Sequence, residues 1–129
     1  MLSEIALDTS IVIPIFDNDP VLRRRFADIE TAWIPVPVIA EIAVGFSDAS
    51  PHPSQQSEFE LFLSSLKVLE CTSNVAMRYG TIHRLLRGKG SMIPINDIWI
   101  AACCLEAGLP LATRDNHFLR IPDLKIEMW

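Results

Sequence analysis

Short apolar runs alternate with longer segments of helical periodicity along the whole chain, and this alternation constrains the fold more than any other feature. Short strands that alternate with helices are typical of an α/β fold with a mainly parallel sheet. Gly45, Gly88 and Gly108 are predicted to end helices, and Asn96 to cap the N-terminus of the last long helix. The strands are predicted over residues 5–7, 33–36, 67–69, 109–112 and 124–128, the last at an edge, and the helices over 10–16, 20–29, 38–46, 54–66, 74–87 and 97–107.

Length and composition indicate one domain over residues 1–129. Half of the residues are hydrophobic and the mean hydropathy is +0.28, so the chain has ample material for a core. No apolar stretch is long enough to span a bilayer, and no secretory signal is visible at the N-terminus. The three cysteines lack a Cys-x-x-Cys spacing and are predicted to be core residues in a reducing compartment. We therefore expect a cytoplasmic protein that does not bind membranes.

Four acidic residues stand at places where a parallel sheet could gather them. Asp8 directly follows the first predicted strand, and Asp115 comes just after the fourth. Glu41 lies one helical turn beyond the second strand, and Asp97 lies in the first turn of a helix that leads to a strand. Ligands of open parallel sheets bind beyond the carboxyl ends of the strands, so one crevice could hold all these carboxylates. Taken singly, each Asp also has a simpler interpretation as a cap, turn or first-turn residue.

Glu41 is the acid that is hardest to explain in this way. It is the one ionisable residue in WIPVPVIAEIAVGF, residues 33–46, and no Lys or Arg lies between Arg25 and Lys67. A buried carboxylate must take up a proton or find a cation. Either Glu41 reaches the surface, or something outside the chain neutralises it.

A divalent cation would make the gathering of these acids favourable. Carboxylates in one crevice repel one another and raise one another's pKa. Because the set contains no His and no Cys, it predicts oxygen-only ligation of Mg²⁺ or Mn²⁺ rather than zinc. An ion that is held by carboxylates and keeps several waters is the usual device for phosphate-ester chemistry.

The chain resembles the PIN-domain nucleases, and most closely the VapC toxins of bacterial toxin–antitoxin pairs. The resemblance rests on an ordered set of segments that covers nearly the whole chain. They are LDTSIVIPIF at the start, PVPVIAEIAVGF in the middle, YGTIHRLLRGKG, and IPINDIWIAACCLEAGLPLATRDNHFLRIPDLKIEMW to the end. Many relatives carry Asn where this chain has Ser10.

The resemblance implies a fold, a site and an activity. The family fold is a three-layer α/β/α arrangement around a parallel five-stranded sheet. By resemblance, Asp8, Asp97 and Asp115 are the principal metal ligands. Glu41 then binds through water or orients the attacking water, and the hydroxyl of Thr9 supports the site. The implied reaction is Mg²⁺- or Mn²⁺-dependent cleavage of RNA, with tRNA or rRNA as substrate, a cognate antitoxin as inhibitor and a homodimer as assembly.

His117, next to the last acid, is interpreted as a turn or surface residue, with help in a proton transfer as the alternative. Arg114 is predicted to contact phosphate or to form a salt bridge with a nearby acid. The net charge of −5 argues against a nucleic-acid ligand, but without the four acids the balance is nearly even. The basic clusters at residues 23–25 and at Arg84, Arg87 and Lys89 could contact phosphates or be solvated helix faces.

Two further hypotheses concern partners. The apolar surplus at Ile11, Ile13, Ile15 and Phe16 could be buried by an amphipathic antitoxin helix, although a dimer interface or plain core would also explain it. The alternative function is a catalytically inactive PIN-like module that binds RNA or protein without cutting it.

Overall fold

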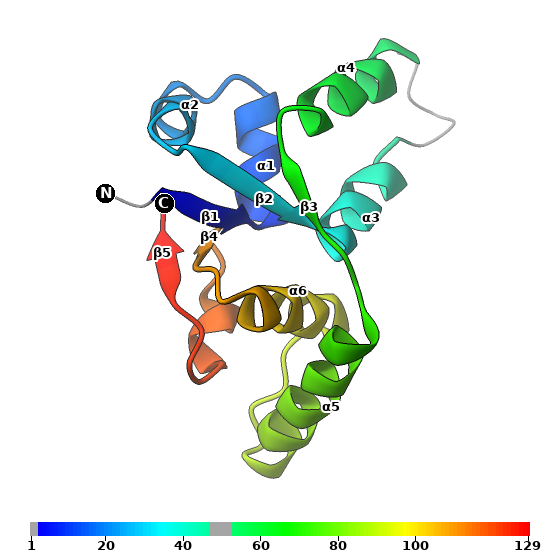
Figure 1. The fold of residues 1–129 in the computed structure, drawn as a ribbon, viewed down its shortest axis with the longest axis vertical. Helices are drawn as coiled ribbons and strands as arrows, with labels where there is room; N and C mark the ends of the chain where they lie inside the picture. Colours follow the sequence, from blue (N-terminus) through cyan, green and yellow to red (C-terminus); the bar gives the residue numbers. More distant parts are fainter. Residues whose placement is uncertain (1–2, 47–52) are drawn as a thin grey trace.

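A five-stranded parallel sheet forms the centre of the protein in the computed structural model, which describes residues 3–46 and 53–129 (Figure 1). The strands are β1 (Glu4–Leu7), β2 (Thr31–Pro35), β3 (Lys67–Leu69), β4 (Leu111–Thr113) and β5 (Ile126–Met128). Their order is β3-β2-β1-β4-β5, and every neighbouring pair is parallel. The predicted α/β class is confirmed, and β5 lies at an edge as expected.

Helices cover both faces of this sheet. Figure 1 shows α1, α2 and α4 on one side and α5 and α6 on the other, which is the three-layer arrangement that the resemblance implied. The helix α3 follows β2 and contacts both α1 and α6. The helices are α1 (Thr9–Phe16), α2 (Pro20–Ala27), α3 (Val36–Val44), α4 (Pro53–Leu63), α5 (Ser73–Gly88) and α6 (Ile95–Ala107), with a 3₁₀ turn η1 (Asn116–Arg120) after β4.

The core combines the buried residues of the central strand β1 and its neighbours with the inward faces of α1 and α6. Leu7 and Leu111 are fully buried, and so is Ile98. The helix α6 ends at Gly108, whose φ of 68° is the left-handed conformation that favours glycine at this position. Cys103 and Cys104 are core residues as predicted, but Cys71 is exposed because it lies just beyond the edge strand β3.

The start of α6 differs from the prediction. The N-cap residue is Pro94 rather than Asn96, and the helix begins at Ile95. Asn96 is already inside the first turn, and its side chain turns to the carboxylate of Glu41 instead of capping the helix. Within the described residues, no helix is both long enough and apolar enough to cross a membrane.

The strand order decides where a site can form. The chain runs outward from β1 through β2 to β3 and then returns to β4 on the other side of β1. The boundary between β1 and β4 is therefore a topological switch point, where connections leave in opposite directions and open a crevice at the carboxyl ends of the strands. Asp8 and Asp115 follow these two strands.

Candidate metal-binding active site

Asp8 lies at the end of β1, where its side chain is 4% exposed. It occupies the N-cap position of α1, but its carboxylate makes no capping hydrogen bond, so the simple cap interpretation does not hold. Its Oδ2 atom instead accepts hydrogen bonds from Ser10 Oγ at 2.8 Å and from Thr113 Oγ1 at 2.7 Å. Both hydroxyls bind the same oxygen, and Oδ1 accepts no hydrogen bond from the described residues, which leaves it available to a ligand.

The two hydroxyls also tie the ends of β1 and β4 together. The Ser10 Oγ atom accepts a hydrogen bond from the Arg114 backbone N–H at 3.0 Å, and Thr113 Oγ1 accepts one from Asp115 N–H at 2.9 Å. Thr9, whose hydroxyl was predicted to support the site, makes no hydrogen bond to these acids. Its buried Oγ1 has no hydrogen-bond partner among the described residues. Successive helix residues point about 100° apart, so Ser10 faces β4 when Thr9 does not.

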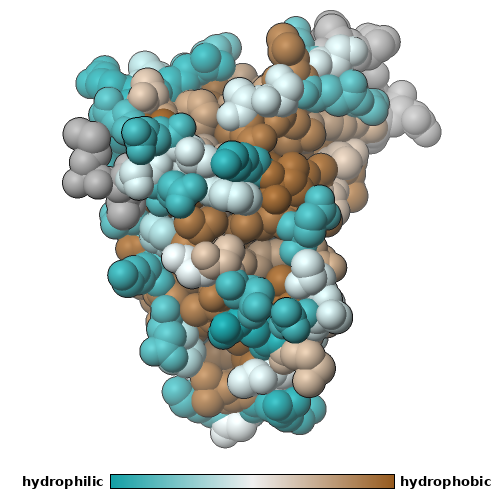
Figure 2. All heavy atoms as spheres, viewed as in Figure 1, coloured by the Kyte–Doolittle hydropathy of each residue, from teal (hydrophilic) through white to brown (hydrophobic). Residues whose placement is uncertain are grey.

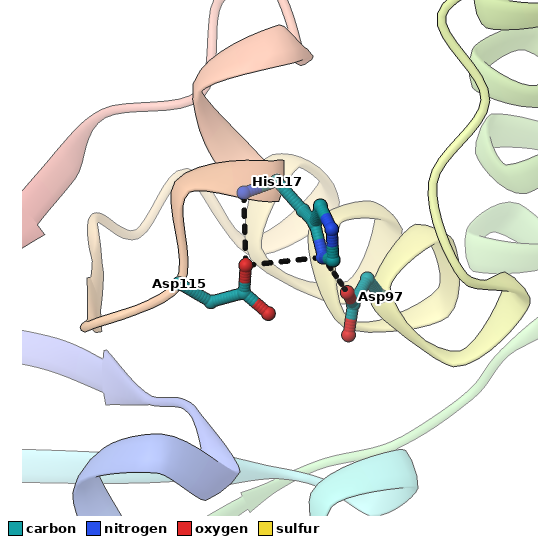
Figure 3. A group of neighbouring side chains, drawn as sticks. All are labelled: Asp97, Asp115 and His117. Atoms are coloured by element: carbon teal, nitrogen blue, oxygen red, sulfur yellow. Dashed lines mark hydrogen bonds and ion pairs between the residues drawn. The ribbon is translucent and has the colours of Figure 1, made fainter.

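Asp115 and His117 form the next part of the site. The Asp115 Oδ1 atom accepts a hydrogen bond from the His117 backbone N–H at 2.9 Å, so this carboxylate does cap η1, one of the simpler interpretations of its position. The same turn brings His117 Nδ1 to 3.0 Å from Asp115 Oδ1 and to 3.3 Å from Asp97 Oδ2 (Figure 3). His117 is thus a turn residue with a partly exposed ring, as interpreted, but the ring also lies beside two of the acids. The two-residue spacing from Asp115 was the signal that could have found it.

Asp97, in the first turn of α6, lies between the other acids with its side chain 13% exposed. Burial is the main cause that raises its pKa from 3.8 to about 6. The carboxylates of Asp115 and Asp8 raise this pKa further, Glu41 adds a small increase, and the contact with His117 opposes the shift. The other three predicted acids are therefore close enough to Asp97 to raise its pKa. A cation bound among them would lower this pKa again.

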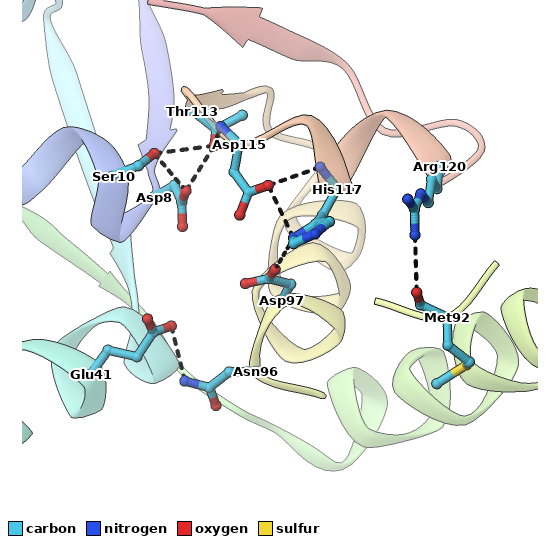
Figure 4. A network of polar contacts seen from close by, with 10 residues as sticks. All are labelled: Asp8, Ser10, Glu41, Met92, Asn96, Asp97, Thr113, Asp115, His117 and Arg120. Atoms are coloured by element: carbon cyan, nitrogen blue, oxygen red, sulfur yellow. Dashed lines mark hydrogen bonds and ion pairs between the residues drawn. The ribbon is translucent and has the colours of Figure 1, made fainter. Parts of the chain in front are cut away.

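Glu41 enters the crevice from α3, the helix that directly follows β2, and lies across from Asp8 (Figure 4). Its side chain is only half buried, and its Oε1 atom accepts a hydrogen bond from Asn96 Nδ2 at 2.9 Å. The charged residue in the apolar segment thus reaches a polar surface that it shares with the other acids. This placement removes the cost of burying it in the core.

Arg114 makes the salt bridge that was one of its two predicted roles. Its terminal nitrogen lies 3.8 Å from Asp19 Oδ2, and its Nε–H donates to the Trp129 carbonyl oxygen at 3.1 Å. In the basic cluster at residues 23–25, Arg23 Nε–H donates to the Ile15 carbonyl at 2.9 Å. These contacts position both side chains, and neither contact involves the four acids.

The donors in the crevice fit a hard divalent ion. Asp97, Asp115 and His117 each offer one ligand atom, and these three atoms lie within 4.8 Å of one another. The free Oδ1 of Asp8 adds a further carboxylate oxygen at the neighbouring strand end. Carboxylate oxygens are the ligands that Mg²⁺ and Mn²⁺ prefer, and a divalent ion beside Asp97 would offset the repulsion from Asp115 and Asp8 that contributes to its raised pKa.

Comparison with known proteins identifies the family. The family model of the PIN domain matches residues 5–124. Ribonuclease VapC2 of Haemophilus influenzae is 32% identical over 127 residues, which cover 95% of this chain and 96% of that protein. The chain is a VapC-type PIN domain.

Solved VapC-type structures share its fold. The structure of VapBC2 from Rickettsia felis, bound to a DNA fragment from its promoter, superposes with a TM-score of 0.89 at 26% identity and covers 98% of both chains. VapBC-5 from Mycobacterium tuberculosis, a member of the VapBC family of toxin–antitoxin systems, gives a TM-score of 0.74 at 25% identity over 97% of this chain and 96% of that one. The VapC-type resemblance and the PIN fold are confirmed.

Proposed function

We propose that this VapC-type PIN domain is a Mg²⁺- or Mn²⁺-dependent endoribonuclease, the toxin of a toxin–antitoxin pair, which acts in the cytoplasm on tRNA or rRNA. Asp8, Glu41, Asp97 and Asp115 form its catalytic site. The observation that carries the proposal is the gathering of these carboxylates at the switch point, where burial and then the neighbouring carboxylates raise the pKa of Asp97 to about 6. The related Haemophilus protein is named a ribonuclease, and this agrees with the proposal.

Asp8, Asp97 and Asp115 are the residues that would hold the ion. When bound, a divalent ion at such a site lowers the pKa of a water molecule and offsets negative charge on the scissile phosphate. The hydroxyls of Ser10 and Thr113 hold one oxygen of Asp8 in place and so direct the other towards the crevice.

Glu41 has a different role in the proposed reaction. Because Asn96 binds only one of its two carboxylate oxygens, the second can orient a water molecule for attack on the phosphate. Its position on α3 places it across the crevice from Asp8, where it can receive a proton without being a direct ligand (Figure 4).

The charge pattern of α5 supports an RNA substrate despite the net negative charge. Between Glu70 and Asp97 the sequence has four basic residues, Arg78, Arg84, Arg87 and Lys89, and no acidic one. Arg78 forms a salt bridge with Glu106 on α6, so Arg84, Arg87 and Lys89 are the charges that a phosphate would meet. The helix α5 packs on α6, which carries Asp97. Arg120 Nη1–H donates to the Met92 carbonyl at 3.0 Å and so joins the loop after α5 to η1 beside His117 (Figure 4). A phosphate backbone that leaves the crevice along α5 would meet positive charge.

The apolar surface supports a protein partner, although at a different place from the one predicted. Ile11 and Ile15 belong to the core, whereas the side chain of Ile13, on the same helix, is 46% exposed. Figure 2 shows a larger apolar area framed by α3, α4 and β3. Val44 on α3 and Leu61 on α4 are 80% and 73% exposed. An antitoxin helix could cover such a surface, and the M. tuberculosis relative belongs to a toxin–antitoxin system. The homodimer stays a prediction.

RNA cleavage by the purified chain tests the proposal. We expect tRNA or rRNA to be cut with Mg²⁺ or Mn²⁺ and left intact with EDTA, and we expect Asp8→Asn and Asp97→Asn to abolish the cleavage. Asp28→Asn is the matched control, since Asp28 is an exposed acid at the end of α2 and should leave the activity unchanged.

Two results would contradict the assignment of nuclease activity to this site. Cleavage that persists in both site variants would come from another site or another protein. If the wild-type chain cuts neither tRNA nor rRNA with either ion but binds RNA or a partner tightly, the chain is the inactive PIN-like module.

A further inference from the structure

The His117 imidazole is the least explained group in the crevice. Its ring is 42% exposed, yet its Nδ1 atom is shielded from solvent and points between the carboxylates of Asp97 and Asp115 (Figure 3). The backbone hydrogen bond from His117 to Asp115 fixes the turn that places it there. A ring held in this way by its own backbone has been positioned before any ligand arrives.

The contacts of Nδ1 are short but are not hydrogen bonds. Asp115 Oδ1 lies 3.0 Å and Asp97 Oδ2 3.3 Å from it. Neither oxygen lies where the N–H of the ring would point, so Nδ1 has no hydrogen-bond partner among the described residues. An ion pair of a protonated imidazole with one carboxylate would align the N–H with that oxygen.

The same distances fit neighbouring ligands of one metal ion. Two donors at right angles around a six-coordinate ion, each about 2.1 Å from it, lie about 3.0 Å apart. At such a site each neighbouring donor stands to the side of the nitrogen lone pair, because the lone pair points at the ion. This is the arrangement of Nδ1 relative to its two carboxylates.

We propose that His117 Nδ1 is a ligand of the divalent ion, together with Asp97 and Asp115, and that it makes the site prefer Mn²⁺ to Mg²⁺. The proposal rests on the metal-dependent function given above and adds a ligand to the acids. Mg²⁺ is a hard ion that favours oxygen, whereas Mn²⁺ stands at the start of the transition-metal series that accepts imidazole nitrogen more readily. An oxygen-only set would show a weaker preference.

Electron spin-echo spectroscopy of Mn²⁺ bound to the purified full chain tests the ligand directly. We expect modulation from a coordinated ¹⁴N nucleus in the wild type, replaced by the ¹⁵N pattern when the histidines are labelled with ¹⁵N. His117→Gln should remove it. His83→Gln is the matched control and should keep the signal, because His83 is a half-buried histidine on α5 whose ring lies tilted against that of Tyr79.

Calorimetric titration tests the proposed preference of the site for Mn²⁺ over Mg²⁺. We expect His117→Gln to weaken Mn²⁺ binding by about 10-fold or more and Mg²⁺ binding by less than about 3-fold, so the ratio of the two affinities falls. His83→Gln should leave both affinities and their ratio unchanged. If His117→Gln does not fold, as judged by circular dichroism, the isotope comparison on the wild-type chain decides alone.

The outcomes separate this inference from the proposed function. Mn²⁺ binding that depends on Asp97 but shows no nitrogen coupling would overturn the role of His117 and leave the carboxylate site standing. Wild-type chain that binds neither Mn²⁺ nor Mg²⁺ would reject the metal-dependent nuclease and the ligand together.

Discussion

Asp8 and Glu41 face each other across one crevice, but the protein holds them in different ways. Asp8 is 4% exposed and accepts hydrogen bonds from two hydroxyls that belong to β4 and α1. Glu41 is half buried on α3 and, among the residues that the structure describes, has one hydrogen bond, from an exposed amide on α6. We infer that the sheet side of the site, formed by Asp8 and the hydroxyls that bind it, is ordered before an ion arrives. The α3 side, formed by Glu41 and Asn96, can adjust to what the crevice contains.

The largest effect should follow from the loss of the fixed acid. Asp8→Asn removes a charge that the ion needs; the amide oxygen can keep both hydroxyl contacts, and the free Oδ1 is then replaced by an NH₂ group that cannot bind a cation. We expect ion affinity and RNA cleavage to fall by more than about 100-fold, since even an outer partner of a metal ligand is worth 10- to 100-fold. Calorimetry with Mn²⁺ and gel-based cleavage of tRNA measure the two losses. A Mn²⁺ affinity of Asp8→Asn within about 3-fold of wild type would show that the Asp8 side of the crevice matters no more for ion binding than the Glu41 side.

Asp97 lies between the two sides, and its raised pKa predicts a pH-dependent stability. A carboxyl whose pKa is about 6 when folded and near 3.8 when unfolded binds its proton more tightly in the folded state. The metal-free protein should therefore lose stability as the pH rises from about 4 to about 6, by up to about 3 kcal/mol, and stay at that lower level above it.

Denaturant unfolding of wild type and Asp97→Asn in EDTA at pH 4 to 8 measures how the free energy of unfolding depends on this carboxyl. The free energy of unfolding of the variant should not fall between pH 4 and 6, so the variant should be the more stable protein at neutral pH, although it binds ions poorly. A variant less stable than wild type at pH 7 would show that burial and the neighbouring carboxylates do not destabilise the charged form of Asp97.

The hydroxyl network should have an intermediate effect. Ser10→Ala removes one donor to Asp8 and the acceptor of the Arg114 backbone N–H, so we expect about a 10-fold loss of ion affinity. Thr9→Val is the matched control one residue earlier and should change ion affinity by less than about 2-fold, because its hydroxyl has no partner among the described residues. Calorimetry on both variants decides, and a larger effect from Thr9→Val would restore the role that the resemblance implied for it.

On the adjustable side, Glu41→Gln should separate binding from reaction. We expect ion affinity to stay within about 3-fold, because Glu41 acts through water, while cleavage at saturating ion falls by about 10-fold or more. Single-turnover cleavage at several Mn²⁺ concentrations separates the two quantities. A loss of ion affinity as large as that of Asp8→Asn would make Glu41 a direct ligand.

The smallest effect should come from Asn96→Ala, which removes the one hydrogen bond that orients Glu41. Because this contact is exposed, we expect cleavage to fall by no more than about 3-fold and the free energy of unfolding to change by less than about 1 kcal/mol. The same cleavage assay and thermal unfolding measure both. A loss of 10-fold would show that the α3 side is as rigidly built as the sheet side.

Much of the fold could be read from the sequence because the buried strands are short, apolar and bounded by helical periodicity. The ends of β1 and β4, and hence the local settings of Asp8 and Asp115, follow from that pattern. Periodicity contains no information on strand order, however, and the pairing of β1 with β4 is what brings these two acids together. The expectation that the acids meet rested on the general rule that ligands bind beyond the carboxyl ends of parallel strands, and neither that rule nor the resemblance specified this pairing.

The details that sequence reasoning missed depend on the direction of single side chains. The choice between Thr9 and Ser10 turns on where α1 begins, and a shift of one residue rotates the hydroxyl by about 100°. Asn96 was assigned to the cap because Pro94 was not recognised as the residue before the helix. His117 enters the crevice through a 3₁₀ turn whose geometry the helical and strand periods do not describe.

Anomalous diffraction from Mn²⁺-soaked crystals of the wild-type chain tests the central claim most directly. We expect a Mn²⁺ peak in the crevice at the ends of β1 and β4, within bonding distance of Asp97 and Asp115 and next to the free oxygen of Asp8. Well-ordered crystals in which Mn²⁺ occupies other sites and leaves this crevice empty would contradict it.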